Sequence, residues 1–305
     1  MLTVIGSINM DLVVTTPEIP KVGETILGRD FKQYPGGKGA NQAVAAAQLN
    51  MPVCFLGCVG DDSYGSTMIR CMSESCIDVS RIKSVKDYST GIAVISVNDK
   101  GQNNIVVISG ANSFVDEKYI DDNIDAISMS EVVLCQMEIS IPTVEHAFSK
   151  AKELGKITIL NPAPAAAISD RLIGLTDILI PNEHELQRLT GVPTDSTKGI
   201  SDAAKIMMDK GVKILIVTLG KRGCAVFTSV ESNWYPAYEV KAVDSTAAGD
   251  SFIGGFIWSF MKDRNLSDAI KAGQLVASMA VQKKGAQSSL PTLKEVIEYS
   301  KYLKV

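Results

Sequence analysis

Short apolar runs separated by helical stretches occupy most of the chain, and this alternation restricts its fold more than any other feature. Such alternation is typical of a doubly wound α/β domain, in which a mostly parallel sheet carries helices on both faces. We expect one such domain over residues 1–305. The expected strands are 2–6, 53–57, 132–136, 157–160, 178–180 and 214–218, and the expected helices lie near 64–76, 142–154, 183–189 and 201–210.

Two segments, 12–34 and 91–109, interrupt the alternation. The first is predicted to form two strands joined by a proline-bearing loop, with Ile26 and Leu27 among its apolar residues. In the second, side chains alternate as in a strand, and residues 98–101 carry the Asp-Lys-Gly sequence of a hairpin turn. We expect the two segments to pair into a small β-sheet that projects from the main domain as a lid.

Charge and composition exclude several classes of protein. A formal net charge of −4 gives no basic footprint for nucleic acid or anionic membrane. The sequence has neither an apolar run of about 18 residues nor a secretory signal pattern. Its six cysteines form no CxxC pair, which favours reduced, mostly buried thiols and a cytoplasmic location. With only His146 and His184 available, a zinc site or a Ser-His-Asp triad is disfavoured.

A helix is predicted to begin at the small residues 247–249, because Phe252, Phe256 and Phe260 recur every four residues after them. Free backbone N–H groups and the positive end of the helix dipole suit a bound anion at such a start. Asp250 would repel that anion unless it takes the proton from the group that attacks it, as in phosphoryl transfer. The alternative is that Asp250 merely caps the helix.

Polar residues follow several of the expected strands, where open α/β sheets bind ligands. Asn9 and Asp11 come just after the first strand, with an Asx turn as the alternative interpretation. Other polar residues also follow strands: Glu138, Asn161, Asn182, Glu185 and the segment 218–223. Each of them could by itself be a helix cap or a turn, but their shared position at strand ends favours a single ligand-binding cleft.

The glycine-rich segment 36–41 precedes an alanine-rich stretch that favours a helix. Its glycines permit close backbone approach to a ligand, although a tight turn that caps a helix explains them equally well. The chain contains neither the GxxxxGK[ST] nor the GxGxxG spacing, which disfavours Walker-type nucleotidases and Rossmann dehydrogenases.

Two ordered motifs resemble the signatures of the ribokinase-like family of sugar and nucleoside kinases, also called the phosphofructokinase-B carbohydrate kinases. The first combines residues 6–11 with 36–45, and the second is 243–252. Segments 161–165, 181–183 and 284–287 are similar to the ribokinases more narrowly. The resemblance implies a doubly wound fold with a β-sheet lid, often used for dimerisation, and ATP-dependent phosphorylation of D-ribose at its 5-hydroxyl.

The resemblance also implies site residues. Asp250 would be the general base, and the backbone amides of Ala247, Ala248, Gly249 and Asp250 would form the anion hole. The sugar would contact Asn9, Asp11, Gly37, Lys38, Asn41, Glu138 and Asp250, and the nucleotide would contact Asn182, Thr218, Gly220, Lys221, Arg222, Gly223, Gly249 and Gln274. Mg²⁺ would be organised through water by Asn182 and Glu185, and K⁺ would be held near Asp244, Thr246, Ala280, Lys283, Gly285 and Ser289.

The alternatives are of two kinds, another substrate and a protein without catalytic activity. The sugar could be 2-deoxyribose, fructose or a nucleoside such as adenosine. A catalytically silent regulator with the same fold is disfavoured by the intact Asp250, because a binding protein needs no base. One departure from the family is Gln274, which stands where a histidine often lies near the adenine.

Overall fold

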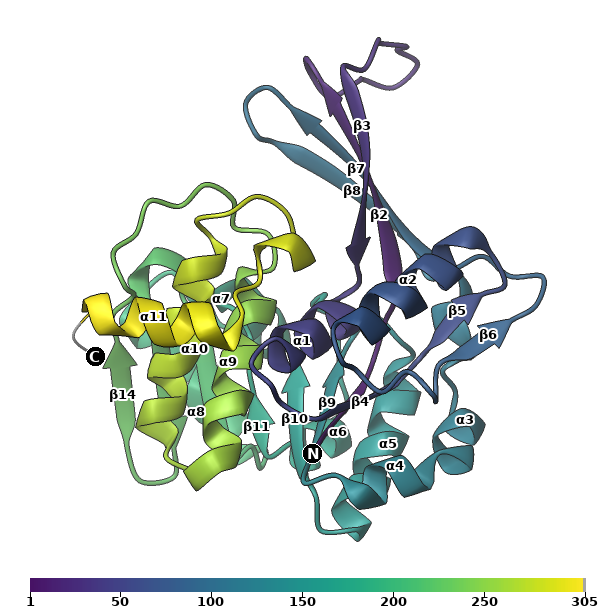
Figure 1. The fold of residues 1–305 in the computed structure, drawn as a ribbon. Helices are drawn as coiled ribbons and strands as arrows, with labels where there is room; N and C mark the ends of the chain where they lie inside the picture. Colours follow the sequence, from purple (N-terminus) through teal and green to yellow (C-terminus); the bar gives the residue numbers. More distant parts are fainter. Residues whose placement is uncertain (304–305) are drawn as a thin grey trace.

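An eight-stranded, mostly parallel sheet forms the centre of the molecule, which a computed structural model describes for residues 1–303 (Figure 1). Its first six strands, in spatial order, are parallel. The seventh runs antiparallel to the sixth, and the eighth runs antiparallel to the seventh. The order is β4 (Val53–Leu56), β1 (Leu2–Ile5), β9 (Val132–Gln136), β10 (Ile157–Asn161), β11 (Ile178–Leu179), β12 (Ile214–Thr218), β13 (Cys224–Thr228) and β14 (Ser232–Tyr235). The predicted fold class is confirmed, and the β13–β14 hairpin was not predicted.

Helices cover both faces of this sheet, because successive side chains of a buried strand point to opposite faces. In β9, for example, Val132 and Leu134 join one apolar core while Val133 and Cys135 join the other. One face is covered by α1 (Lys38–Ala47), α2 (Ser63–Glu74), α9 (Ala248–Asp263) and α10 (Leu266–Ala280), with α11 (Leu293–Leu303) against α10. The other is covered by α3 (Glu117–Asp122), α4 (Ile124–Met129), α5 (Ile141–Glu153), α6 (Asp170–Gly174), α7 (Glu183–Thr190) and α8 (Thr197–Asp209).

A separate four-stranded sheet projects from the main body (Figure 1). It confirms that the two interrupting segments pair with each other, and its strand order is β3 (Asp30–Gly36), β2 (Asn9–Thr16), β7 (Gly91–Asn98) and β8 (Asn103–Ile108). The prediction of Ile26 and Leu27 as strand residues was wrong. The ladder between β2 and β3 begins at the pair Thr15 and Asp30, so the intervening chain has no strand beside it and Leu27 is 89% exposed.

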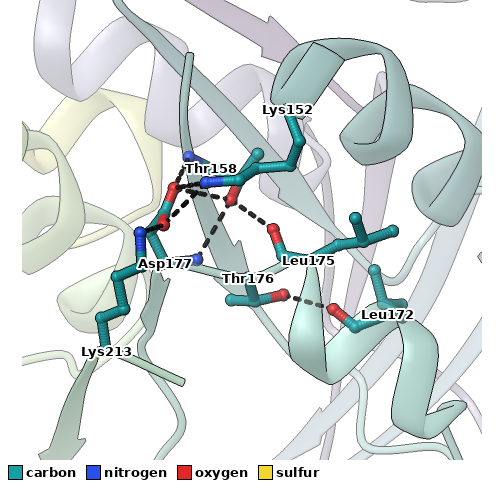
Figure 2. A network of polar contacts seen from close by, with 7 residues as sticks. All are labelled: Lys152, Thr158, Leu172, Leu175, Thr176, Asp177 and Lys213. Carbon is teal, nitrogen blue, oxygen red and sulfur yellow. Dashed lines mark hydrogen bonds and ion pairs between the residues drawn. The ribbon is translucent and has the colours of Figure 1, made fainter. Parts of the chain in front are cut away.

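A polar network joins neighbouring strands of the main sheet near their amino-terminal ends, and Figure 2 shows its residues. The predicted site lies at the opposite, carboxyl ends of the strands. The Asp177 carboxylate accepts hydrogen bonds from the Lys152 Nζ at 2.7 Å and from the Thr158 backbone N–H at 3.0 Å, and pairs with the Lys213 Nζ at 2.8 Å. Burial alone would raise the pKa of Asp177, but these donors outweigh it and lower the pKa. The network therefore stabilises the negative charge of Asp177 between β10, β11 and α5.

Candidate active site

The carboxyl ends of β1, β9 and β10 meet at one edge of the sheet, where the chain order reverses. After β1 the chain first adds β4 on one side and later β9 on the other, which is the switch point at which open α/β sheets bind ligands. Ser7 follows β1, Glu138 follows β9 and Asn161 ends β10. Helices α1 and α9 both begin at this edge and bring their first turns together.

Asp250 lies in the first turn of α9 and is only 7% exposed. Its Oδ1 accepts a hydrogen bond from the Gln42 Nε2 at 2.9 Å, and its Oδ2 accepts one from the Asn41 Nδ2 at 3.2 Å. The residue at the N-cap is Ala247, which makes no side-chain cap, so Asp250 does not serve as the N-cap of this helix. The carboxylate is instead held by the first turn of α1, on the opposite side of the site.

The turn before α9 has the backbone form of an anion site. Ala247 adopts the left-handed conformation, with φ of 57°, and ends the turn that leads into the helix. The first amides of a helix have no acceptor within the helix. A Cβ added at Gly249 would meet no heavy atom within 4 Å, so the space beside this residue is open. The stacked rings of Phe252, Phe256 and Phe260 anchor α9 in the core, as their spacing predicted.

Lys38 is surrounded by carboxylates. Its burial alone would lower its pKa, but the negative charges of its neighbours outweigh this effect and raise the pKa. Those neighbours are Asp250, Glu138, Glu185 and Asp11. Burial, followed by the charges of Glu138 and Asp250, raises the pKa of Asp11 to about 7, and burial also raises the pKa of Glu185. Four acidic groups thus lie near enough to Lys38 for their charges to act on it.

Glycines let the first turn of α1 approach the start of β2. A Cβ added at Gly36 would lie 2.4 Å from the Asp11 carboxylate, and one at Gly37 would lie 2.8 Å from the Asn9 backbone nitrogen. Gly37 also has φ of 88°, which other residues rarely adopt. Asn9 and Asp11 belong to β2 and pair with β3, so the alternative of an Asx turn was wrong. Asn9 is buried, and its Oδ1 accepts a hydrogen bond from Asn112 at 2.8 Å.

A pocket of about 450 Å³ opens beside the start of α9. Its wall is mostly apolar, with Ala237, Tyr238 and Val240 opposite the helices α9 and α10. Six of the residues predicted to bind the nucleotide line it: Thr218, Gly220, Lys221, Gly223, Gly249 and Gln274. A volume of this size suits a small organic ligand.

Two predicted nucleotide residues do not line this pocket. Asn182 forms a capping box at the start of α7, in which its Oδ1 accepts from the Glu185 N–H and the Glu185 carboxylate accepts from the Asn182 N–H, both at 2.8 Å. Arg222 instead pairs with Glu183. Glu185 nevertheless lies close enough to Lys38 and Asp250 for their charges to act on its pKa.

The predicted cation residues bring two loops together beside the helix start. One Asp244 carboxylate oxygen accepts from the backbone and hydroxyl of Thr246, at 2.9 and 2.6 Å, and the other accepts from the Gly285 N–H at 2.9 Å. Ser289 is buried, and its hydroxyl donates to the Ala286 carbonyl at 2.7 Å. Lys283 points to Glu295 instead, with its Nζ 2.9 Å away, so only its backbone could face a cation.

Several contacts of the site involve residues to which the sequence assigned no role. The Ser7 Oγ donates to the Glu138 carboxylate at 2.5 Å, and the Gln287 Nε2 donates to the Asn41 Oδ1 at 3.1 Å. Gln42 contacts Asp250, as described above. All three lie inside segments that carried the family resemblance, so their position in those motifs was the available signal.

Comparison with known proteins identifies the family. The family model described as pfkB family carbohydrate kinase matches residues 1–293. The chain is a member of this family. It is 42% identical to a ribokinase of Haemophilus influenzae, over 98% of this chain and 97% of that protein. It is also 39% identical to a deoxyribokinase of Salmonella typhi, over 98% of each protein.

A solved structure of Arabidopsis thaliana ribokinase, complexed with ribose and ATP, superposes with a TM-score of 0.92 at 34% identity. The match covers 97% of this pfkB chain and 97% of that chain. Across the 303 residues described, no helix of this family member is long and apolar enough to cross a membrane.

Proposed function

We propose that this pfkB family member is an ATP-dependent ribokinase, which transfers the γ-phosphoryl group of ATP to the 5-hydroxyl of D-ribose. The observation that carries the proposal is the buried Asp250 carboxylate at the open amide turn of α9, between the polar groups of β2 and α1 and the adjacent pocket. The similarity to a ribokinase solved with ribose and ATP supports the same pair of substrates.

The chemistry follows from this arrangement. Asp250 accepts the proton of the attacking hydroxyl, while the amides of residues 247–250 stabilise the charge that develops on the transferred phosphoryl group. A carboxylate is a weak base towards an alcohol. Most of the acceleration therefore comes from aligning the two substrates and from Lys38, whose charge neutralises phosphate oxygens.

Mg²⁺ fits the acidic side of the site. Magnesium in nucleotide sites is bound by one or two carboxylates, by water and by the substrate phosphates. Glu185 supplies a carboxylate near Lys38 and Asp250, and Asn182 holds it in place through the capping box. Among the described residues no three His, Cys, Asp or Glu side chains cluster as a protein-only metal site. When bound, the metal would neutralise the phosphate charge.

The projecting sheet is proposed to close over the sugar as a lid of the one domain formed by residues 1–305. Asn9 and Asp11 lie at the base of its strand β2, so the sugar would contact the sheet directly. Exclusion of water from the site would prevent hydrolysis of ATP during transfer. We also propose a cytoplasmic location, where both substrates would be available.

The sugar specificity tests this function. We expect kcat/KM for ribose to exceed that for 2-deoxyribose by at least about tenfold, equivalent to about 1.4 kcal/mol. Without the 2-hydroxyl, a partner such as the buried Asn9 or the half-buried Asp11 would lose a hydrogen bond, which costs about 1–3 kcal/mol. The measurement is ADP release with ATP and Mg²⁺ against a panel of pentoses, hexoses and nucleosides.

The variant Asp11→Ala should narrow the ratio, mainly by weakening activity on ribose, whereas Asp30→Ala, at the exposed far end of β3, should leave it unchanged. Deoxyribokinase activity is the alternative, favoured by the 39% identity to the Salmonella typhi enzyme. Equal efficiency on both sugars, or a preference for 2-deoxyribose, would select that alternative.

A monovalent cation is proposed to bridge the loops that carry Asp244 and Gly285. Their hydrogen bond already joins them, and a cation held largely by backbone oxygens would fix the turn that presents the amides of α9. We expect activity to be about tenfold higher in K⁺ than in tetramethylammonium at equal ionic strength, a difference of about 1.4 kcal/mol. Equal rates in the two salts would contradict the proposal.

A homodimer formed through the projecting sheet is proposed from its exposed apolar side chains. Ile105, Val106 and Val107 of β8 are each at least 51% exposed, which is unusual for adjacent large apolar residues. We expect wild-type protein to sediment as a dimer and Val106→Lys to shift it towards monomer, since a buried unpaired charge opposes association. A wild-type monomer at micromolar concentration would contradict this expectation.

A further inference from the structure

Gln42 connects the proposed base to the core of the molecule. It lies in the first turns of α1 and is fully buried. The two hydrogens of its Nε2 are both used: one donates to the Asp250 Oδ1 at 2.9 Å and the other to the Asn161 Oδ1 at 3.0 Å. Its Oε1 accepts from the Gln136 Nε2 at 2.7 Å. The side-chain amide of Gln42 thus has every partner it can use in this setting.

The direction of these hydrogen bonds is fixed by the partners. Asn161 donates its Nδ2 to the Ile180 carbonyl at 2.9 Å, and a carbonyl only accepts, so the Asn161 oxygen must face Gln42. An ionised Asp250 is also only an acceptor. A reversed Gln42 amide would face two acceptors with its own oxygen. The N–H donors of Gln42 therefore point to Asp250 in the one arrangement that satisfies all three residues.

Gln136 fixes Gln42 from behind. It is the last residue of β9 and is fully buried, so its own position is set by the sheet. Its Oε1 lies against Gly6, where an added Cβ would come within 2.2 Å of it, and this oxygen has no hydrogen-bond partner among the described residues. Among the described residues, the side chain of Gln136 therefore makes one hydrogen bond, the donation to Gln42.

The positive charge of Lys38 attracts the Asp250 carboxylate. This attraction opposes the hydrogen bond from Gln42, because a closer ion pair would draw the carboxylate towards the ammonium group. Within residues 1–303, Gln42 is the one side chain that donates to the Oδ1 atom, because Asn41 donates to the Oδ2 atom. Loss of Gln42 would therefore free Oδ1, the oxygen that its hydrogen bond now fixes.

We propose that Gln42, backed by Gln136, is a positioning residue that holds the Asp250 carboxylate in line to receive the proton of the sugar hydroxyl. This inference rests on the proposed kinase function. It adds that two buried side-chain amides, those of Gln42 and Gln136, hold the catalytic base in place. Displacement of a reacting group by about 1 Å can cost on the order of 10²-fold in rate. The support should therefore act on kcat and leave sugar affinity nearly unchanged.

The test is a double-mutant cycle with Gln42→Met, which keeps the length of the side chain and removes its donors. Ribose turnover should fall about 10–100-fold in kcat, with KM for ribose within about threefold of wild type. In the Asp250→Asn background, the same substitution should change kcat by less than about threefold, because there is no longer a base to position. Equal losses in the two backgrounds would overturn the proposal, as would an unchanged kcat in Gln42→Met.

Stability needs a matched control, because Gln42→Met also leaves buried partners without hydrogen bonds. Thr158→Val removes a buried hydroxyl from β10, the strand that ends at Asn161, and breaks its bonds to the Leu175 carbonyl and to Asp177 (Figure 2). It should lower the melting temperature while kcat stays within about twofold of wild type. A kcat loss in Thr158→Val equal to that in Gln42→Met would show that general destabilisation explains both, and would overturn the proposal.

If Gln42→Met does not fold, the same double-mutant cycle is measured with Gln136→Met, which acts on Asp250 through Gln42. In the wild-type background this substitution should lower kcat about 3–10-fold. In the Asp250→Asn background the same substitution should leave kcat nearly unchanged. An unchanged kcat in Gln136→Met would then overturn the proposal. Absence of sugar kinase activity in the wild-type protein would instead contradict the proposed function, so the two failures are distinguishable.

Discussion

Asp250→Asn is expected to lower kcat by about 10²–10⁴-fold, or roughly 3–5 kcal/mol in the barrier, while ribose binding stays near that of the wild type. Asparagine keeps the size of the side chain and removes the group that accepts the proton. The effect should be large because Asp250 is the acidic residue in the first turn of α9, at the open amide turn. Its neighbours Asn41 and Gln42 offer only amides, which are not bases at neutral pH.

The measurement is steady-state ADP release together with calorimetric binding of ribose. Asp263→Asn is the matched control, because it makes the same change at the exposed last residue of the same helix. It should retain wild-type kcat. Normal turnover in Asp250→Asn would remove this residue from the chemistry and leave it a structural acceptor for the first turn of α1.

Lys38→Met is expected to lower kcat/KM by about 10²–10³-fold, comparable with the loss of one well-placed charge-stabilising donor. The methylene chain is retained, so packing at the start of α1 is preserved. Without the ammonium group, Asp11, Glu138, Glu185 and Asp250 would face the phosphates of ATP uncompensated. The loss should therefore appear both in KM for ATP and in kcat.

The comparison for Lys38 is Lys118→Met, which removes an exposed lysine paired with Asp122 on α3. Exposed ion pairs of this kind contribute little because solvent screens them, so activity should not change. Raising the ionic strength should not restore the activity of Lys38→Met, because salt screens the charges of a buried site only weakly. Wild-type ATP affinity in Lys38→Met would place the lysine away from the phosphates.

The sequence predicted the main sheet well because buried parallel strands are continuous apolar runs. The runs 132–136 and 214–218 correspond to β9 and β12 without a shift in bounds. The antiparallel hairpin of β13 and β14 was not predicted: β13 is a short buried apolar run of the same kind, but β14 is not. Its half-buried residues Ser232–Tyr235 have no apolar run, and their direction is set by pairing with β13.

The site was harder to predict because its contacts join distant parts of the chain. A local pattern cannot tell a helix cap from a buried base, and the Gln42 partner of Asp250 lies 208 residues away in sequence. Asn9 and Asp11 were expected after a strand, but they begin the next one, since the chain continues from β1 into β2 with only Gly6, Ser7 and Ile8 between. The family motifs identified the residues of the site, but their hydrogen-bond partners depend on the tertiary structure.

The root of strand β2 gives the projecting sheet a mechanical property. Asn9 is buried and pairs with Gly36 on one side and Gly91 on the other, so the sheet is clamped where the sugar is proposed to bind. From Asn9 to Thr16 the strand rises roughly 23 Å, at about 3.3 Å per residue. A rotation of about 10° at Asn9 would carry the far end of β2 through roughly 4 Å at that length. The proposed sugar site therefore lies next to the point about which the projecting sheet would rotate. A small rotation there would move the far end of the sheet by several ångströms.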